Sequence, residues 1–120
     1  MVKKNSRIFV AGHKGLVGSA IIRELKAKGY KKIITASRKR LDLRNHDKVI
    51  RFLKTKKPEF IFIAAAKVGG IYSNLKYKAD FITENLQIQT NLIHGAFSCG
   101  INNLIFLGSS CVYPKNCKQP

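Results

Sequence analysis

A loop with three evenly spaced glycines is the first feature of the chain that suggests chemistry. Gly12, Gly15 and Gly18 lie between an apolar run and a stretch with helical spacing, in the order Gly12-His13-Lys14-Gly15-Leu16-Val17-Gly18. In such a unit the first glycine allows a tight turn, the second lets a pyrophosphate approach, and the third lets the helix pack closely. We expect residues 12–18 to bind a dinucleotide at the helix N-terminus, with simple turn formation as the alternative.

The end of the second predicted strand indicates which dinucleotide is bound. NAD-binding sites usually carry an acidic residue there, which accepts a hydrogen bond from the ribose 2′-OH. The chain instead reads Ser37-Arg38-Lys39-Arg40. A guanidinium suits a 2′-phosphate, so NADP(H) is favoured, with Arg38 and Lys14 as candidate ligands. Alternatively, either side chain is a solvated cation.

Two more segments are expected near the cofactor. Ala64, Ala65 and Ala66 end the third predicted strand with small side chains, which suit either a cofactor crossing the sheet edge or close helix packing. Asp42 and Leu43 precede a predicted helix, where Asp42 either faces an adenine amino group or caps the helix.

Ser109 and Cys111 follow the fourth predicted strand, at the edge where open α/β sheets bind ligands. Their residue types leave their roles open, because such a serine usually forms a turn and a free cysteine is usually a small buried residue. The three histidines have no metal-ligand spacing, so we expect no metal site.

Strands and helices alternate around these residues. Strands are expected over 7–11, 32–35, 60–66 and 103–107, and helices after the glycine loop, after Asn45 and over Lys78–Ser98, with residues 67–78 as a loop. The pattern predicts an α/β fold, a Rossmann-type doubly wound parallel sheet of which this is the N-terminal portion, about four strands. No covering helix follows the last strand, so the chain looks truncated.

The segment Lys78–Ser98 has apolar residues on two sides. One stripe holds Ile82, Leu86, Ile93 and Phe97, and the other holds Phe81, Ile88 and Leu92. Two stripes suggest two partners, the sheet and a second subunit, although one wide core face explains them equally well.

Composition narrows the class of protein. The 120 residues suit one domain, and the chain has no transmembrane stretch, no signal peptide and no paired cysteine motif, so we expect a cytoplasmic protein without a membrane partner. The net charge is +17. Because the lysines are spread along the sequence, we interpret them as a solvated surface and expect no nucleic-acid partner.

The glycine loop, the segment Ala64-Ala65-Ala66-Lys67-Val68-Gly69-Gly70-Ile71 and the segment Leu107-Gly108-Ser109-Ser110-Cys111-Val112-Tyr113-Pro114-Lys115 together resemble the GDP-L-fucose synthase family of extended short-chain dehydrogenase/reductases. The resemblance implies conversion of GDP-4-keto-6-deoxy-D-mannose to GDP-L-fucose, by 3,5-epimerisation and NADPH-dependent reduction at C4. It implies that Cys111 moves protons during epimerisation and that Ser109 hydrogen-bonds the ketone oxygen. It also implies that Lys78–Ser98 forms a homodimer interface.

The resemblance implies that the family's catalytic Tyr-x-x-x-Lys pair and its C-terminal sugar-nucleotide domain lie beyond residue 120. Tyr72 and Lys76 have the same spacing, but they precede the fourth predicted strand. We therefore expect the chain alone to be inactive. The alternatives are a non-catalytic NADP-binding remnant, a split subunit and, less favoured, a basic nucleic-acid-binding module.

Overall fold

The fold is a four-stranded parallel sheet with helices on both faces. A computed structural model describes residues 2–109, 113–114 and 116–118. The strands are β1 (Ile8–Ala11), β2 (Ile33–Ile34), β3 (Phe60–Ile63) and β4 (Leu104–Phe106), in the order β2-β1-β3-β4. All neighbouring pairs are parallel, and Phe9, for example, lies opposite Ile34 on one side and Ile61 on the other. The predicted α/β class is confirmed.

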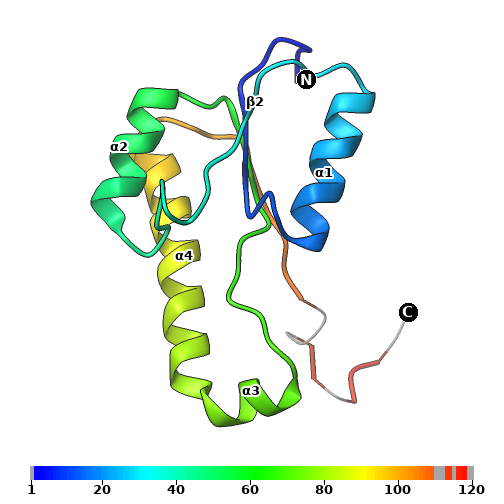
Figure 1. Cartoon of the computed structure of the whole chain (residues 1–120), viewed down its shortest axis with the longest axis vertical. Helices are drawn as coiled ribbons and strands as arrows, with labels where there is room; N and C mark the ends of the chain where they lie inside the picture. Colours follow the sequence, from blue (N-terminus) through cyan, green and yellow to red (C-terminus); the bar gives the residue numbers. More distant parts are fainter. Residues whose placement is uncertain (1, 110–112, 115, 119–120) are drawn as a thin grey trace.

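The helices are divided between the two faces of the sheet (Figure 1). They are α1 (Leu16–Ala27), α2 (His46–Lys56), α3 (Ile71–Lys76) and α4 (Lys78–Ser98). One core joins α1 to Ile8 and Val10, and the other lies beneath α2 and α4 and contains Phe9 and Ala11. Because successive strand residues point to opposite faces, the whole of β1 is buried, which explains its unbroken apolar sequence.

Three residues outside the helices determine where α1 and α4 end and where α2 begins. Gly29 and Gly100 follow α1 and α4 with positive φ angles of 78° and 69°, a conformation that favours glycine. The side chain of Asn45 accepts from the Lys48 N–H at 2.9 Å and so caps α2. The start of α2 directly after Asn45 and the end of α4 at Ser98 agree with the sequence prediction.

The structure differs from the sequence prediction in two places. The strands are shorter than expected, since Ala64–Ala66 lie beyond β3 and only two residues of 32–35 pair as β2. Residues 71–76, expected to be part of a loop, form α3. Periodicity does not reveal so short a helix, because it spans fewer than two turns.

The two stripes of α4 have different environments. Leu92 is fully buried and Ile88 is half-buried in the core beside the sheet, whereas Phe81 is half-buried next to Gly69. The stripe of Ile82, Leu86, Ile93 and Phe97 is 44–78% exposed. The alternative explanation, in which both stripes belong to one wide apolar face buried in the core, is therefore wrong for this chain. Among the described residues, nothing covers the second apolar stripe of α4.

Candidate functional site

A cavity of about 620 Å³ lies at the carboxyl ends of β1 and β3. The chain crosses from β1 to β2 on one side and later returns to β3 on the other, so the strand order reverses beside β1. In open α/β sheets, ligands bind in the crevice at this reversal. The lining residues are Gly12, His13, Lys14, Gly15, Leu16, Val17, Ala36, Ser37, Arg38, Leu41, Asp42, Leu43, Arg44, Ala64, Ala65, Ala66, Lys67, Val68, Glu84 and Ile88.

Close backbone contacts shape the glycine loop. Gly12 has a φ of +84°, and a Cβ there would lie 2.5 Å from the Ala64 carbonyl oxygen. A Cβ on Gly18 would lie 2.1 Å from the Gly12 carbonyl oxygen. Because both obstacles are backbone atoms, neither can move aside as a flexible side chain would. The protein's own packing therefore requires glycine at both positions.

Gly15 differs from the other two loop glycines. Its φ of −73° is open to any residue, and a Cβ there would meet only the Gly12 carbonyl oxygen, at 3.4 Å. Internal packing therefore does not require glycine here, whereas close approach of a ligand would. Gly15 is also the N-cap of α1, where no side chain caps the helix and the first turn has no acidic residue. These features fit the helix N-terminus to a phosphate.

Glu84, on α4, joins three cations along one wall of the cavity. Its carboxylate lies 2.5 Å from the Lys67 ammonium, 3.3 Å from the Arg44 guanidinium and 3.4 Å from that of Arg38. The hydrogen bond from Lys67 is the main reason that the pKa of Glu84 is lowered. Asn85 fixes the backbone of Lys67, accepting from its N–H at 2.7 Å and donating to its carbonyl at 3.0 Å.

Asp42 pairs with Arg44 on the neighbouring wall. The Arg44 side chain donates two hydrogen bonds to the Asp42 carboxylate, at 2.8 and 3.0 Å, and its backbone N–H donates a third at 3.1 Å. Hydrogen bonding to Arg44 lowers the pKa of Asp42 from 3.8 to about 2. Asp42 is therefore not the cap of α2, which is Asn45. Asn91 of α4 donates to the Leu43 carbonyl at 2.9 Å and holds this segment in place.

The structure brings most of the predicted binding residues to this one cavity. All the predicted cofactor-binding residues line it except Gly18, which is buried under the loop. Arg38 lines the cavity with a 71% exposed side chain that contacts Glu84. Ser109 is exposed just after β4 and is not part of the lining. Cys111 lies outside the described residues.

Sequence reasoning missed Arg44, Lys67 and Glu84. The signal for Glu84 is its place on α4: it lies four residues before Ile88 and eight before Leu92, on the stripe that faces the sheet. A carboxylate on such a stripe indicates cationic partners close by. Nothing in the sequence around Lys67 or Arg44 indicates that they share this partner.

The described residues hold neither a cluster of metal ligands nor a helix that could span a membrane. No group of three or more potential metal ligands lies together there. None of the described helices combines the length and apolar character needed to cross a bilayer.

Comparison with known proteins finds close similarity over the whole chain. The model of the NAD dependent epimerase/dehydratase family matches residues 8–120. Putative GDP-L-fucose synthase 2 of Arabidopsis thaliana is 52% identical over 120 residues, which are 100% of this chain and 37% of that protein. GDP-L-fucose synthase of Escherichia coli is 46% identical over 114 residues, 95% of this chain and 36% of the relative. The chain thus spans little more than a third of these relatives.

Solved structures agree with the sequence relatives. A GDP-mannoheptose C4 reductase from Campylobacter jejuni with NADP bound matches with a TM-score of 0.94 and 41% identity, covering 100% of this chain and 38% of that one. A GDP-L-fucose synthetase from Naegleria fowleri bound to NADP matches with a TM-score of 0.84 and 26% identity, covering 100% of this chain and 36% of that one.

Proposed function

Because the chain belongs to the NAD dependent epimerase/dehydratase family, we propose that it forms the NADP-binding part of a GDP-sugar epimerase-reductase of the GDP-L-fucose synthase type. The observation that carries the proposal is the cavity at the carboxyl ends of β1 and β3. Its loop is built for a pyrophosphate, and it carries arginine at the end of β2, where an NAD site carries a carboxylate. The similar solved structures that have NADP bound support the same cofactor.

In this proposal the cofactor lies across the strand ends. The pyrophosphate binds the free N–H groups at the start of α1, over Gly15. Arg38 and Lys14 bind the 2′-phosphate, and the ion pair with Glu84 holds Arg38 in place along the wall of the cavity. Ala64–Ala66 leave room beside β3, and Asp42 and Leu43 line the end where the adenine lies.

Substitution of Arg38 tests the cofactor assignment. Loss of a charge-assisted contact of about 1.5–3 kcal/mol should weaken NADPH binding in Arg38→Ala about ten-fold or more, with NADH binding unchanged. Lys39→Ala is the matched control, because it removes a neighbouring charge that does not line the cavity. Fluorescence titration of the protein made from its full coding sequence measures both affinities. Equal losses for NADPH and NADH would refute the role of Arg38.

The catalytic roles rest on Ser109 and Cys111. When bound, NADPH supplies the hydride that reduces the C4 ketone. The Cys111 thiolate removes the proton at C3 or C5, next to the ketone, which leaves an enolate, and a second acid on the opposite face of the sugar supplies the new proton. The Ser109 hydroxyl donates to the ketone oxygen, where negative charge builds up in both reactions. Cys111→Ser should abolish deuterium exchange at C3 and C5 of GDP-4-keto-6-deoxy-D-mannose, with NADPH binding retained.

The exposed stripe of α4 supports a homodimer. Ile82, Leu86, Ile93 and Phe97 present an apolar surface that a second copy of the same helix would bury. Ile82→Glu should then shift the protein from dimer to monomer in sedimentation velocity.

A cytoplasmic location suits an enzyme of nucleotide-sugar biosynthesis.

A further inference from the structure

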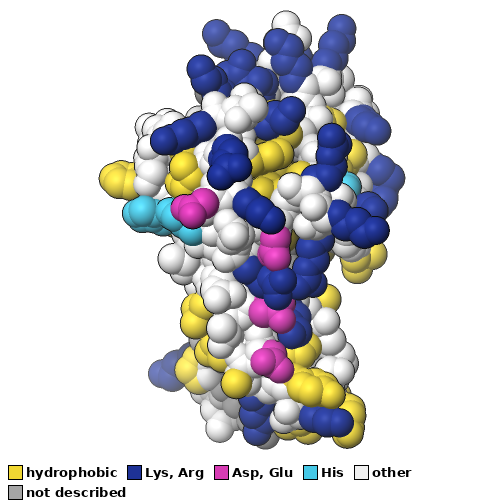
Figure 2. All heavy atoms as spheres, turned by 60° about the vertical axis from the view of Figure 1, so that its left-hand side comes forward, with side chains coloured by type: hydrophobic (Ala, Val, Ile, Leu, Met, Phe, Trp, Pro, Cys, Tyr) yellow, Lys and Arg dark blue, Asp and Glu magenta, His cyan; other side chains and the backbone are white. Residues whose placement is uncertain are grey.

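The amino ends of the strands form a second functional candidate, on the edge of the sheet opposite the cofactor cavity. Six lysines from three separate segments lie along this edge: Lys4, Lys28, Lys31, Lys32, Lys54 and Lys57. We call them the amino-edge surface. In Figure 2 the Lys and Arg side chains crowd the upper end of the visible face, and the acidic side chains appear only lower down.

Backbone contacts bring these segments together. The Lys4 ammonium donates to the Lys28 carbonyl, and the Lys31 N–H donates to the Lys4 carbonyl at 3.3 Å. Across β1, the side chain of Arg7 donates to the Lys57 carbonyl at 2.6 Å. Lysines far apart in the sequence therefore share one edge, which the expectation of a dispersed solvated surface did not foresee.

The charge on this edge is poorly balanced. Glu24 pairs with Lys28 at 3.1 Å, and Glu59 pairs with Arg7 at 3.8 Å. Among the described residues, Lys31, Lys32, Lys54 and Lys57 have no acidic partner within ion-pair distance. An excess of cations on one edge produces a positive potential that attracts polyanions.

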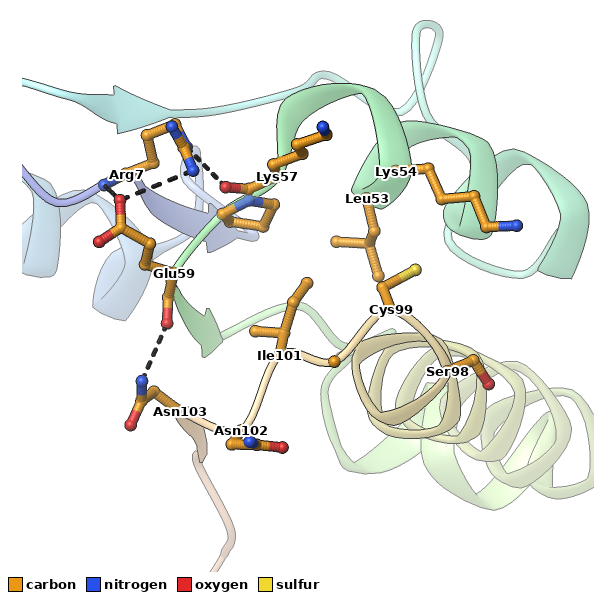
Figure 3. A pocket seen from close by; sticks show the side chains of 12 residues that line it. Arg7, Leu53, Lys54, Lys57, Glu59, Ser98, Cys99, Ile101, Asn102 and Asn103 are labelled. Atoms are coloured by element: carbon orange, nitrogen blue, oxygen red, sulfur yellow. Dashed lines mark hydrogen bonds and ion pairs between the residues drawn. The ribbon is translucent and has the colours of Figure 1, made fainter.

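The edge is also hollowed. A cavity of about 670 Å³ lies between the last turn of α2 and the segment that joins α4 to β4. Figure 3 shows Lys54 and Lys57 on the α2 side of it, with Ser98 and Asn102 on the other side. The lining therefore holds three cations, Arg7, Lys54 and Lys57, against one carboxylate, that of Glu59, which is paired with Arg7. Together with the uncharged hydrogen-bonding groups, this excess of cations suits phosphate and sugar oxygens.

We propose that the amino-edge surface binds the phosphate backbone of a nucleic acid, without reading its sequence. The only aromatic ring among these segments that contacts one of the six lysines is Tyr30, which is half-buried with the Lys4 ammonium 4.6 Å from its centroid. Tyr30 is thus not free to stack on a base. The surface offers charge and hydrogen bonds instead, which position a backbone and carry no sequence information.

An anionic membrane is the less favoured partner for two reasons. The described segments 2–7, 23–32 and 51–59 carry the six lysines but contain none of the large apolar side chains that are strongly exposed. The surface therefore has no apolar group to insert among acyl chains. A bilayer is also flat, whereas this edge contains a recess that a phosphate chain can enter.

Paired charge reversals test the proposal. The protein made from its full coding sequence is titrated against a labelled single-stranded oligonucleotide of mixed sequence at several salt concentrations. Lys31→Glu with Lys54→Glu changes two sides of the surface, and should weaken binding at least about ten-fold and lower the salt slope by about two. The control, Lys76→Glu with Lys78→Glu, makes the same change in net charge at α3 and α4, at the far end of the molecule (Figure 1), and should weaken binding less than about two-fold.

The other possible results of this titration either overturn or support the proposed binding of nucleic acid. Equal weakening by the two pairs would show that only total charge matters and would overturn the proposal. Binding to phosphatidylglycerol vesicles without binding to the oligonucleotide would also overturn it. Displacement of the oligonucleotide by NADPH would place the nucleic acid in the cofactor cavity instead. If the first pair folds poorly, Lys31→Gln with Lys54→Gln removes the same charges, and a weakening of about three-fold would support the surface.

Discussion

The two edges of the sheet use glycine for different purposes. At the carboxyl edge, Gly12 and Gly18 are surrounded so closely by backbone that a single methyl group would not fit. At the amino edge, Gly29 and Gly100 also follow regular elements and have positive φ, yet a Cβ on either would meet nothing within 4 Å. Crowding thus marks the edge that holds the cofactor cavity, whereas the amino-edge glycines only turn the chain.

Charge separates the two edges in the same way. Around the cofactor cavity, Asp42 and Glu84 orient Arg38, Arg44 and Lys67 through short contacts. On the amino-edge surface most lysines have no acidic partner among the described residues. Paired cations have fixed positions and suit a ligand of one shape, whereas unpaired cations suit a flexible polyanion.

The largest effect on stability should come from adding a methyl group to the crowded glycine loop at the carboxyl edge. In Gly18→Ala, the new Cβ would lie 2.1 Å from the Gly12 carbonyl oxygen, so the helix must shift away from the loop. We expect a loss of about 3 kcal/mol in the free energy of unfolding, measured by urea denaturation. Gly29→Ala is the amino-edge control and should lose only about 1 kcal/mol, because its positive φ is the only obstacle. Similar losses in both variants would remove the contrast between the edges.

Gly15→Ala should separate binding from stability. The Cβ meets only one atom, at 3.4 Å, so the free energy of unfolding should change by less than about 0.5 kcal/mol. NADPH affinity should fall about ten-fold, or about 1.4 kcal/mol, because the methyl group occupies the space left for the pyrophosphate. Unchanged affinity in a fluorescence titration would show that the pyrophosphate binds elsewhere.

Lowering the pH should weaken the ion pair between Asp42 and Arg44 at the carboxyl edge. Because the pKa of Asp42 is lowered from 3.8 to about 2, its contribution to stability is present above pH 3.8 and is lost as the pH falls toward 2. For so exposed a pair, this contribution is about 1 kcal/mol. Asp42→Asn should therefore be less stable than the parent protein above pH 4, and the difference should shrink as the pH falls and disappear below pH 2. A constant difference across this range would contradict the ion pair with Arg44.

The smallest effect is expected from relieving repulsion at the amino edge. Lys31→Glu should raise the free energy of unfolding by a few tenths of a kcal/mol at low ionic strength, and added salt should abolish the gain. Lys76→Glu, far from the amino-edge surface, should give a smaller gain. Thermal denaturation at two salt concentrations measures both. Equal gains would show that the repulsion is spread over the whole molecule.

Local patterns in the sequence predicted most of the fold. Glycine spacing, apolar periodicity and the Asn45 cap depend on neighbours along the chain, and they located the strands, the bounds of α4 and the glycine loop. The network around Glu84 could not be found this way, because its partners are up to 46 residues away and meet only when α4 packs beside the sheet. The amino-edge surface was missed for the same reason, since no single segment contains it.

The stacked contacts of Gly18, Gly12 and Ala64 also limit how this protein can change over generations. A side chain at Gly18 strikes the backbone of Gly12, and one at Gly12 strikes the backbone of Ala64. Trimming a neighbouring side chain cannot compensate, because each obstacle is a main-chain atom common to every amino acid. A descendant could accept another residue at either position only after the whole turn had been rebuilt, by insertion or deletion. The loop is therefore expected to diverge at His13, Lys14 and Leu16 long before it diverges at these two glycines.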